Sequence, residues 1–413
     1  MREMKDSGLQ WAGNIPYDWN TTKGKYFMAI LERPIKDDDG VITCFRNGEV
    51  TLRANRREDG FTIATVEAGY QGIEPGDLVI HGMDGFAGAI GISDSRGKGT
   101  PALNVLACSE NKKYIMYLLR AMAYTEVFMA LSTGIRVRTC DTNWKKLRSL
   151  DYLIPPEEEQ QRIADFLDAK CAEIDTLTAD IQTQIDTLEQ YKRSVITETV
   201  SKGLNPNAEM KDSGIQWIGN MPAHWDVIRG KYILRYMQKP VREDDGVITC
   251  FRDGEVTLRS NRREDGFTMS DKEIGYQGID VGDLVVHGMD GFAGSIGISD
   301  SRGKASPVLN VLETDQNKRY IMYYLRSMAY SDVFLALATG IRVRSCDLRW
   351  NKLAELSYPV PLLNEQNAIV KHIDSVLSKA DAVIADKKAQ LATLDEYKKS
   401  LIFEYVTGKK EVI

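Results

Sequence analysis

The side chains best suited to chemistry lie in an arginine-rich segment that occurs twice. Residues 44–58, CFRNGEVTLRANRRE, return as CFRDGEVTLRSNRRE at residues 250–264, and we call each of these segments a recognition strip. Guanidinium and amide groups make paired hydrogen bonds to guanine and adenine edges, so the composition is typical of a surface that contacts DNA bases. The alternative is that Arg56 and Arg57 only solvate an exposed turn beside Glu58 and Asp59.

Two basic loops per copy supplement the strip. The loop GISDSRGK at residues 91–98 is not a P-loop, because five residues separate its glycines and Gly99 stands where Ser or Thr would hold magnesium. Its basic residues fit contacts to DNA phosphates better. A second loop, residues 133–148, has five basic residues against Asp141. The candidate DNA-binding residues are Arg46, Arg53, Asn55, Arg56, Arg57, Arg96, Lys98, Arg136 and Arg138, and in the second copy Arg252, Arg259, Asn261, Arg262, Arg263, Arg302, Lys304, Arg342 and Arg344.

The sequence presents no evident catalytic centre. The segment HGMDGFAG is identical in both copies, and its glycines would let the backbone approach a ligand closely. His81 has no second metal ligand at usable spacing. We find no glycine-rich cofactor loop after a strand and no Asn-Pro-Pro-aromatic motif. We therefore expect no catalytic residue, no metal and no cofactor.

Composition favours a globular protein of a reducing compartment. Charged residues make up 27% and hydrophobic residues 43% of the 413 residues, and no apolar run approaches the length of a membrane span. The start of the chain lacks the apolar core of a signal peptide, and the six cysteines show no C-x-x-C spacing. We expect a cytoplasmic protein with no membrane contact, in which Cys44, Cys140, Cys250 and Cys346 are structural.

The net charge of −6 conceals a segregation of charge along the chain. Residues 157–190 contain ten acidic residues against two basic ones, whereas residues 46–57 contain four arginines against one glutamate. A nucleic-acid partner is therefore compatible with the acidic total.

Each copy predicts a globular part of the α+β class. Short β-rich runs at residues 40–45, 48–52, 76–82 and 88–93 are bounded by turn residues and predict a twisted, mostly antiparallel sheet. Residues 111–131 have apolar positions at helical spacing and predict one helix packed on that sheet.

A long helix follows each globular part. After Pro155 and Pro156 about 45 residues run to Lys202 without Pro or Gly, and apolar residues recur every seven positions from Leu167 to Val195. The second copy has a corresponding pattern from Ile373 to Leu401, interrupted by Lys387. We expect the two helices to pack against each other as rods of roughly 65 to 70 Å. The alternative is that each helix folds back on its own globular part.

The whole chain is a tandem duplication. The segment from Met4 to Val200 aligns without a gap with the segment from Met210 to Val406, at an offset of 206 residues. Two equivalent surfaces on one chain suggest a ligand with two equivalent parts. The expected domains are a globular part over 1–155, a helix over 156–203, a second globular part over 204–361 and a second helix over 362–413.

Three segments carry a resemblance to a known family. The run from TGIRVR to PPEEEQQRIADFLDAKCAEID (residues 133–175), its second version PVPLLNEQNAIVKHID (359–374) and the opening SGIQWIGNMPAHW (213–225) are similar to the specificity subunits of type I restriction-modification enzymes. The resemblance extends over essentially the whole chain, in order and twice.

This resemblance implies a non-catalytic DNA-binding subunit. Each globular part would be a target recognition domain, and the helices would form an antiparallel coiled coil that docks two methyltransferase subunits and, through them, the restriction (nuclease-translocase) subunits. The family pattern assigns partner binding to Glu159, Gln160, Ile163, Glu365, Gln366 and Ile369.

The near identity of the two strips predicts a particular target. Family members commonly carry two unlike recognition domains, whereas here residues 40–62 differ from their equivalents at only two positions. A bipartite double-stranded DNA site that forms an interrupted inverted repeat is therefore expected. Two other classes stay open: a self-sufficient DNA-modifying enzyme, and a coiled-coil scaffold that does not bind DNA.

Overall fold

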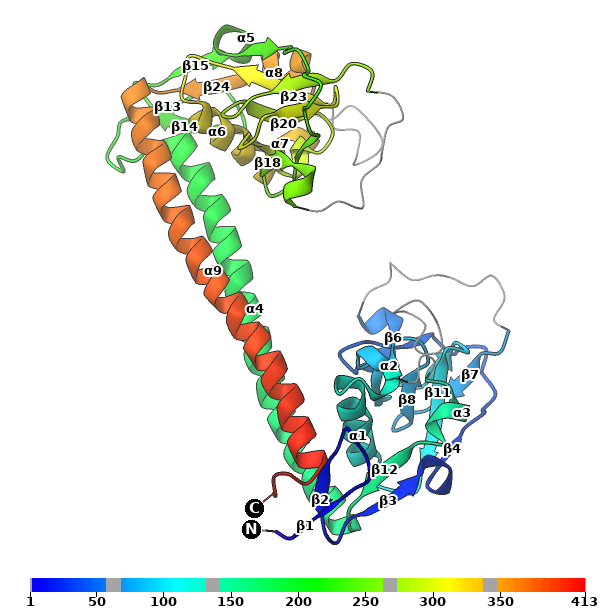
Figure 1. Cartoon of the computed structure of the whole chain (residues 1–413). Coiled ribbons are helices and arrows are strands. Elements are labelled where there is room, and N and C mark those ends of the chain that lie inside the picture. The colour runs from blue at the N-terminus through cyan, green and yellow to red at the C-terminus, as the bar shows by residue number, and fades with distance from the viewer. Residues whose placement is uncertain (1, 57–67, 131–141, 263–272, 337–347, 413) are drawn as a thin grey trace. The chain divides into compact units, whose positions relative to one another are not determined.

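The computed structural model describes residues 2–56, 68–130, 142–262, 273–336 and 348–412 (Figure 1). The chain forms two compact units. Unit 1 comprises Met1–Ile181 and Lys388–Ile413, and unit 2 comprises Gln182–Lys387. Each unit thus contains one globular repeat together with part of both long helices.

Unit 1 is built from short antiparallel strands around one four-stranded sheet. The sheet has the order β4-β11-β8-β9, and the pairs β1-β2, β3-β12, β5-β6 and β7-β10 form two-stranded sheets. The strands are β1 (Met4–Asp6), β2 (Asn14–Pro16), β3 (Asn20–Lys23), β4 (Met28–Ile30), β5 (Ile42–Cys44), β6 (Val50–Leu52), β7 (Gln71–Ile73), β8 (Leu78–His81), β9 (Ile90–Ile92), β10 (Gly97–Gly99), β11 (Leu103–Cys108) and β12 (Asp151–Ile154). The predicted antiparallel α+β class is confirmed.

Unit 2 repeats this order of elements. Its four-stranded sheet is β16-β23-β20-β21. The strands are β13 (Met210–Asp212), β14 (Asn220–Pro222), β15 (Asp226–Arg229), β16 (Arg235–Met237), β17 (Ile248–Cys250), β18 (Val256–Leu258), β19 (Gln277–Ile279), β20 (Leu284–His287), β21 (Ile296–Ile298), β22 (Gly303–Ala305), β23 (Leu309–Glu313) and β24 (Ser357–Val360).

Helices α1 (Lys112–Tyr124) and α6 (Lys318–Tyr330) are the buried centres of the two units. The side chain of Asn111 caps α1 by accepting from the backbone N–H groups of Lys113 and Tyr114. The prediction of one helix over 111–131 is wrong. Helix α1 ends at Tyr124 and a separate helix, α2 (Val127–Ala130), follows, because Glu126 adopts a φ of 60° that no right-handed helix accommodates.

The remaining described helices include the two long ones. They are α3 (Trp144–Leu147), α4 (Glu157–Lys202), α5 (Gly230–Ile233), α7 (Val333–Ala336), α8 (Trp350–Glu355) and α9 (Leu363–Val406). At 46 and 44 residues, α4 and α9 confirm the predicted long helices. Among the residues that the structure describes, no helix combines the length and apolarity needed to cross a membrane.

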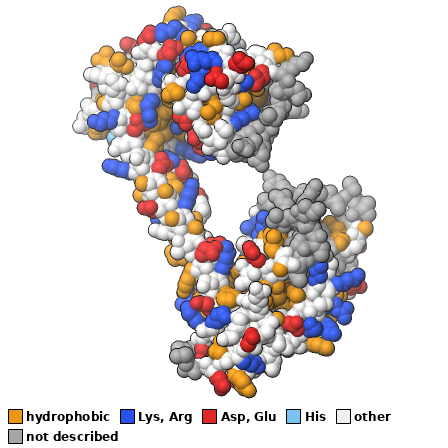
Figure 2. Space-filling model, in the orientation of Figure 1, with side chains coloured by type: hydrophobic (Ala, Val, Ile, Leu, Met, Phe, Trp, Pro, Cys, Tyr) orange, Lys and Arg blue, Asp and Glu red, His pale blue; other side chains and the backbone are white. Residues whose placement is uncertain are grey.

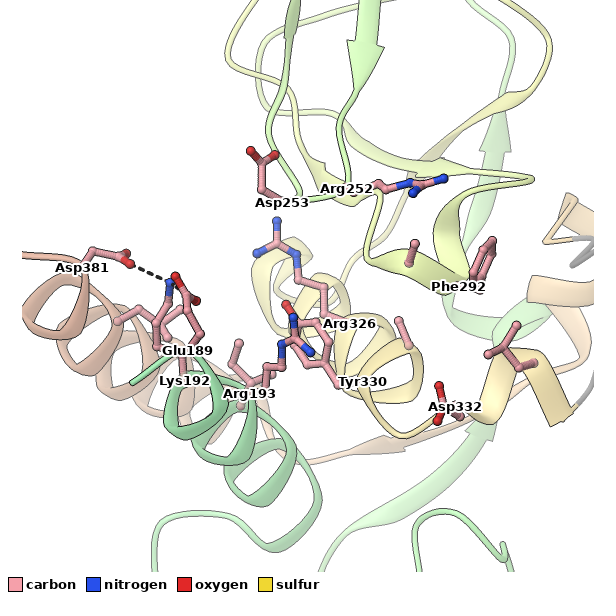
Figure 3. A pocket seen from close by; sticks show the side chains of 15 residues that line it. Glu189, Lys192, Arg193, Arg252, Asp253, Phe292, Arg326, Tyr330, Asp332 and Asp381 are labelled. Carbon is pink, nitrogen blue, oxygen red and sulfur yellow. Dashed lines mark hydrogen bonds and ion pairs between the residues drawn. The ribbon is translucent and has the colours of Figure 1, made fainter. Parts of the chain in front are cut away.

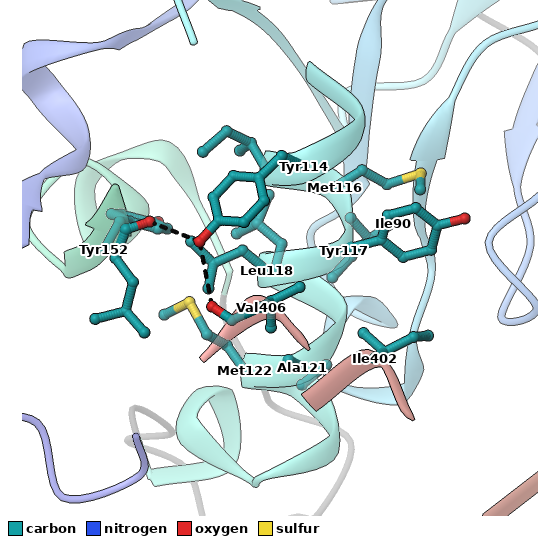
Figure 4. Close-up of a cluster of buried hydrophobic side chains, with 14 of the residues drawn as sticks. Ile90, Tyr114, Met116, Tyr117, Leu118, Ala121, Met122, Tyr152, Ile402 and Val406 are labelled. Carbon is teal, nitrogen blue, oxygen red and sulfur yellow. Dashed lines mark hydrogen bonds between the residues drawn. The ribbon is translucent and has the colours of Figure 1, made fainter. Parts of the chain in front are cut away.

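In unit 1 the start of α4 packs beside the end of α9, which runs in the opposite direction. Phe166 of α4 and Tyr405 of α9 have ring centroids 4.4 Å apart. Leu401, Ile402 and Val406 of α9 belong to the same buried cluster as α1. The Tyr114 hydroxyl shares its proton between the carbonyl oxygens of Leu153 (3.1 Å) and Val406 (3.2 Å). Figure 4 shows its bond to Val406. The end of the second copy therefore completes the core of the first.

Unit 2 has the reciprocal arrangement. Ile196 and Val200, near the end of α4, belong to the buried cluster around α6. The Tyr320 hydroxyl donates to the carbonyl oxygens of Val200 (3.2 Å) and Pro359 (2.9 Å). The end of the first copy therefore completes the core of the second, and the antiparallel coiled coil is confirmed within each unit.

Equivalent ion pairs join the two long helices in each unit. In unit 1 Lys398 Nζ lies 2.6 Å from Asp175 Oδ1, and Lys399 lies 5.9 Å from the ring centroid of Tyr124. In unit 2 Lys192 Nζ lies 2.6 Å from Asp381 Oδ1, and Arg193 lies 5.3 Å from the ring centroid of Tyr330.

We predict that Tyr114→Phe lowers the free energy of unfolding of unit 1 by about 1–3 kcal/mol, because two buried carbonyl groups lose their donor. Urea denaturation followed by hydrogen exchange of α1 and β8 measures the effect. Tyr397→Phe, at a side chain that is 54% exposed, is the control and changes stability by less than about 0.5 kcal/mol. Equal stability of the two variants would contradict the proposed role of the hydroxyl.

Candidate nucleic-acid interface

Each recognition strip forms a hairpin followed by a single helical turn. In unit 1 β5 pairs with β6, and the chain turns at residues 45–49 with Phe45 N donating to Glu49 O over 2.8 Å. Gly48 has a φ of 85°, which glycine adopts at little cost. The 3₁₀ turn Arg53–Asn55 follows β6 directly. Arg46 and Asn47 therefore lie at the tip of the hairpin.

A buried arginine from the central helix holds this hairpin in place. Arg120 of α1 is 9% exposed, and it donates from Nε to Ile90 O (2.9 Å) and from Nη2 to Gly48 O (3.1 Å). In unit 2 Arg326 of α6 makes the same two bonds, to Ile296 O and Gly254 O. Figure 3 shows Arg326 extending from α6 toward the turn that carries Arg252 and Asp253. Sequence analysis overlooked these arginines, although a single charge inside YIMYLLRAMAY was a signal.

The third arginine of the strip stacks on the hairpin. The guanidinium of Arg56 lies 4.2 Å from the ring centroid of Phe45 and donates to Asn47 Oδ1 (3.2 Å) and Glu49 Oε2 (3.1 Å). Arg262 stacks in the same way on Phe251, at 4.3 Å. Stacking on an aromatic ring holds the planar guanidinium at the surface of the hairpin.

Arg53 and Asn55 bond to the hairpin itself. Arg53 Nε donates to Thr43 Oγ1 (3.0 Å), and Asn55 Nδ2 donates to Thr51 Oγ1 (2.9 Å). Arg259 and Asn261 make the equivalent bonds to Thr249 and Thr257. These side chains therefore stabilise the strip, and direct base contact by them stays a prediction.

Arg46 connects the strip to the HGMDGFAG segment. Its Nη2 lies 2.8 Å from Asp84 Oδ1, and Arg252 pairs likewise with Asp290 at 3.0 Å. The ring of His81 accepts backbone hydrogen bonds at Nδ1 from Met83 and Asp84, and burial lowers its pKa. A neutral histidine with its proton on Nε2 is thus a hydrogen-bond donor. The described residues contain no cluster of three potential metal ligands.

Three basic residues of the two GISDSRGK-type loops, Arg96, Arg302 and Lys304, have acidic partners. Arg96 bonds to Asp39 and Glu74, and the hydrogen bond from Arg96 lowers the pKa of Asp39. Arg302 pairs with Asp245 and Asp280, and hydrogen bonds from Lys239 and then Arg302 lower the pKa of Asp280 to about 2. Lys304 pairs with Glu273 at 2.7 Å, and Lys98 lies in β10. Phosphate contact by this loop stays a prediction.

Basic and acidic side chains are interspersed on the face of the protein seen in Figure 2. Six further candidates lie outside the described residues: Arg57, Arg136, Arg138, Arg263, Arg342 and Arg344.

The residues assigned to partner binding are engaged inside their own unit. Gln160 is 1% exposed, and it accepts from Asn111 N and donates to Pro155 O. Glu159 accepts from Trp19 Nε1 over 2.9 Å and pairs with Arg2, and Ile163 is 2% exposed. In unit 2, Gln366 and Ile369 are fully buried and Glu365 lies 2.9 Å from His224. These side chains fasten each helix start to its globular part, so direct contact with a partner stays a prediction.

An open polar pocket lies beside the strip of unit 2. Its volume is about 730 Å³, and its walls are Thr249, Cys250, Phe251, Arg252, Asp253, Arg262, His287, Asp290 and Ser295. Burial raises the pKa of Cys250 to about 12, which agrees with a structural thiol. The pocket therefore offers a ring stacked with a guanidinium, a histidine donor and two carboxylates beside one another.

Two curated relatives from Methanocaldococcus jannaschii match most of the chain. The putative type I restriction enzyme MjaX specificity subunit is 24% identical over 444 residues, covering 97% of this chain and 95% of that protein. The type I restriction enzyme MjaVIII specificity subunit is 24% identical over 324 residues, covering 73% of this chain and 72% of that protein. No protein-family model matches the chain.

A solved structure shares the fold. It comes from work on complex assembly and conformational transition of the type I restriction-modification system, and one of its chains has a TM-score of 0.67 and 13% identity, covering 96% of this chain and 99% of that chain. The duplicated α+β unit with its long helices is therefore a fold shared with a chain of a type I restriction-modification system. The chain is a homologue of type I restriction enzyme specificity subunits, and the resemblance noted in its sequence is confirmed.

We predict that Gly48→Ala destabilises unit 1 much more than Gly76→Ala. Both glycines have a φ near 85°, so both variants cost about 1–2 kcal/mol in backbone strain. A Cβ at Gly76 meets nothing within 4 Å, whereas a Cβ at Gly48 would come within 1.8 Å of Arg120 Nη2 and displace the hairpin anchor. Urea denaturation compares the two variants. Equal costs would show that Arg120 does not hold the hairpin.

Proposed function

We propose that this chain is the sequence-specific DNA-binding subunit of a type I restriction-modification complex. The observation that carries the proposal is the homology to specificity subunits along 97% of the chain. In this role the chain is cytoplasmic and non-catalytic, and it recognises a bipartite double-stranded site through the strips of its two globular parts, which correspond to residues 1–155 and 204–361. Residues 156–203 and 362–413 form the helical spacer.

The geometry of the strip supports DNA contact. Arg46 and Arg252 at the hairpin tips are 62% and 60% exposed, and Arg56 and Arg262 lie stacked at the surface. The hydrogen bonds from Arg120 and Arg326 hold each hairpin in one conformation before DNA binds, which reduces the conformational entropy lost on binding. Because these ion pairs are exposed, an arginine can leave a carboxylate partner such as Asp84 and bind a base edge or a phosphate without leaving an unpaired buried charge.

The long helices offer a surface for the methyltransferase subunits. Leu177 and Tyr191 of α4 are 47% and 51% exposed, and their repeat equivalents Val383 and Tyr397 of α9 are 44% and 54% exposed. Residues 14 positions apart lie on one face of a coiled-coil helix. Exposed apolar residues at equivalent places on both helices fit two copies of one partner, which in turn bring the restriction subunits.

We predict that DNA binding by the full chain weakens steeply with salt and that Arg56→Ala and Arg262→Ala each cost about 1–3 kcal/mol in specific binding. Fluorescence anisotropy with the methylated target of the host, at several salt concentrations, measures both effects. Arg229→Ala, an arginine of β15 paired with Glu355, is the control and retains affinity. Binding that ignores salt and both substitutions favours the scaffold hypothesis.

We predict that the double variant Tyr191→Ala, Tyr397→Ala no longer co-purifies with the methyltransferase subunit, because each docking surface loses its aromatic contact. Leu204→Ala, at an exposed position beyond the end of α4, retains the complex. Undiminished co-purification of the double variant would place the docking surface elsewhere.

A further inference from the structure

The pocket beside the recognition strip has a different wall in the two units. Of the nine residues that line the pocket of unit 2, seven have identical equivalents in unit 1. The two exceptions are Asp253, which corresponds to Asn47, and Ser295, which corresponds to Ala89. Both differences thus fall in the wall of one pocket, whereas Ser260, the other change between residues 246 and 268, is exposed and does not line it.

In unit 1 the amide of Asn47 is oriented by its oxygen. Asn47 Oδ1 accepts from Glu49 N (3.2 Å) and from Arg56 Nη1 (3.2 Å). Because both bonds use the oxygen, the amide nitrogen is left to offer two donors at the tip of the hairpin. Among the described residues, Glu49 is the carboxylate partner of Arg56.

In unit 2 the same place holds a carboxylate. Asp253 accepts from Glu255 N (3.1 Å) and from the guanidinium of Arg262, which also pairs with Glu255. Partial burial opposes the charged form of Asp253, but the hydrogen bonds from Arg262 and from the Glu255 backbone, together with the charge of Arg262, outweigh it, and the pKa of Asp253 lies below its usual value. An ionised carboxylate only accepts hydrogen bonds, so unit 2 lacks the donors that Asn47 offers.

Ser295 adds a second polar group to the same wall. Ser295 is fully buried, and its hydroxyl finds no hydrogen-bond partner among the residues that the structure describes. Ala89 is just as buried in unit 1, so packing alone does not require a hydroxyl there. A buried hydroxyl without a partner costs free energy, and a ligand group that enters the pocket would recover it.

We infer that Asp253, with Ser295 behind it, is a specificity-determining residue that makes the half-site of unit 2 differ from the half-site of unit 1. The inference rests on the proposed function in DNA recognition. A carboxylate accepts from the amino group of cytosine, whereas an asparagine amide pairs with adenine through one donor and one acceptor. The target is therefore an inverted repeat whose two half-sites differ at the base that these side chains contact. This base is cytosine in the half-site bound by unit 2 and adenine in the half-site bound by unit 1.

The test is selection of binding sites from duplex DNA with 40 random base pairs by the full-length protein. The wild type, the double variant Asp253→Asn, Ser295→Ala and the reciprocal variant Asn47→Asp, Ala89→Ser are compared. Each double variant gives one unit the pocket wall of the other, in a setting that already accommodates it. Ser260→Ala, the other difference between the strips, is the matched control.

The expected result is a change of base preference at one position of one arm. The variant Asp253→Asn, Ser295→Ala prefers adenine instead of cytosine in the half-site bound by unit 2. The reciprocal variant prefers cytosine instead of adenine in the half-site bound by unit 1. The control Ser260→Ala keeps the wild-type preference in both half-sites. Arms that are already identical at that position, or that ignore the substitutions, would overturn the inference and leave DNA recognition intact. Failure to enrich any sequence would overturn the proposed function and this inference with it.

Discussion

Each globular repeat depends on a helix end supplied by the other copy. Leu401, Ile402 and Val406 lie in the core around α1, while Ile196 and Val200 lie in the core around α6. Each end also supplies a carbonyl oxygen to a buried tyrosine hydroxyl. Removing such apolar groups from a core typically costs about 2–5 kcal/mol each, so neither repeat is complete by itself. The duplication is thus a structural requirement of the fold.

The same packing also explains how the surface hairpin of each unit, which is proposed to contact DNA, is held in place. The helix ends pack on α1 and α6, and these helices carry Arg120 and Arg326, which hold the turns of the two strips. Glycine at 48 and 254 is needed because any side chain there would overlap the guanidinium. The chain of contacts therefore runs from the long helices through the central helices to the side chains proposed to contact bases.

Sequence patterns predicted the repeated architecture well because each rests on a strong local rule. The short β-rich runs between turn residues form β5, β6, β8 and β9, and the stretch after Pro156 forms α4. The heptad pattern was accurate at Leu167, Ile174 and Ile181, which are buried. Toward the end of α4 the heptad pattern predicted Leu188 and Val195 as buried residues, whereas Ile196 and Val200 are buried. The difference arises because this end of α4 packs on the globular part as well as on α9.

The site was harder to predict because side-chain roles depend on tertiary partners. Arg53 and Asn55 looked like base contacts but bond to threonines of their own hairpin. Gln160 looked like a docking residue because its segment resembles the family pattern, yet it closes the helix start with backbone hydrogen bonds. Conversely, the sequence did not identify Tyr191 and Tyr397 as candidates, because their exposure depends on which residues of α4 and α9 face each other in the coiled coil.

The claim that each long helix completes the core of the other copy is tested most directly by a shortened chain. This chain ends at Ser400 and so lacks Leu401, Ile402 and Val406. Hydrogen exchange resolved by segment would compare the amides of α1 and β8 with those of α6 and β20. The account predicts that α1 and β8 lose protection while α6 and β20 keep theirs. Full protection of α1 in the shortened chain would contradict it.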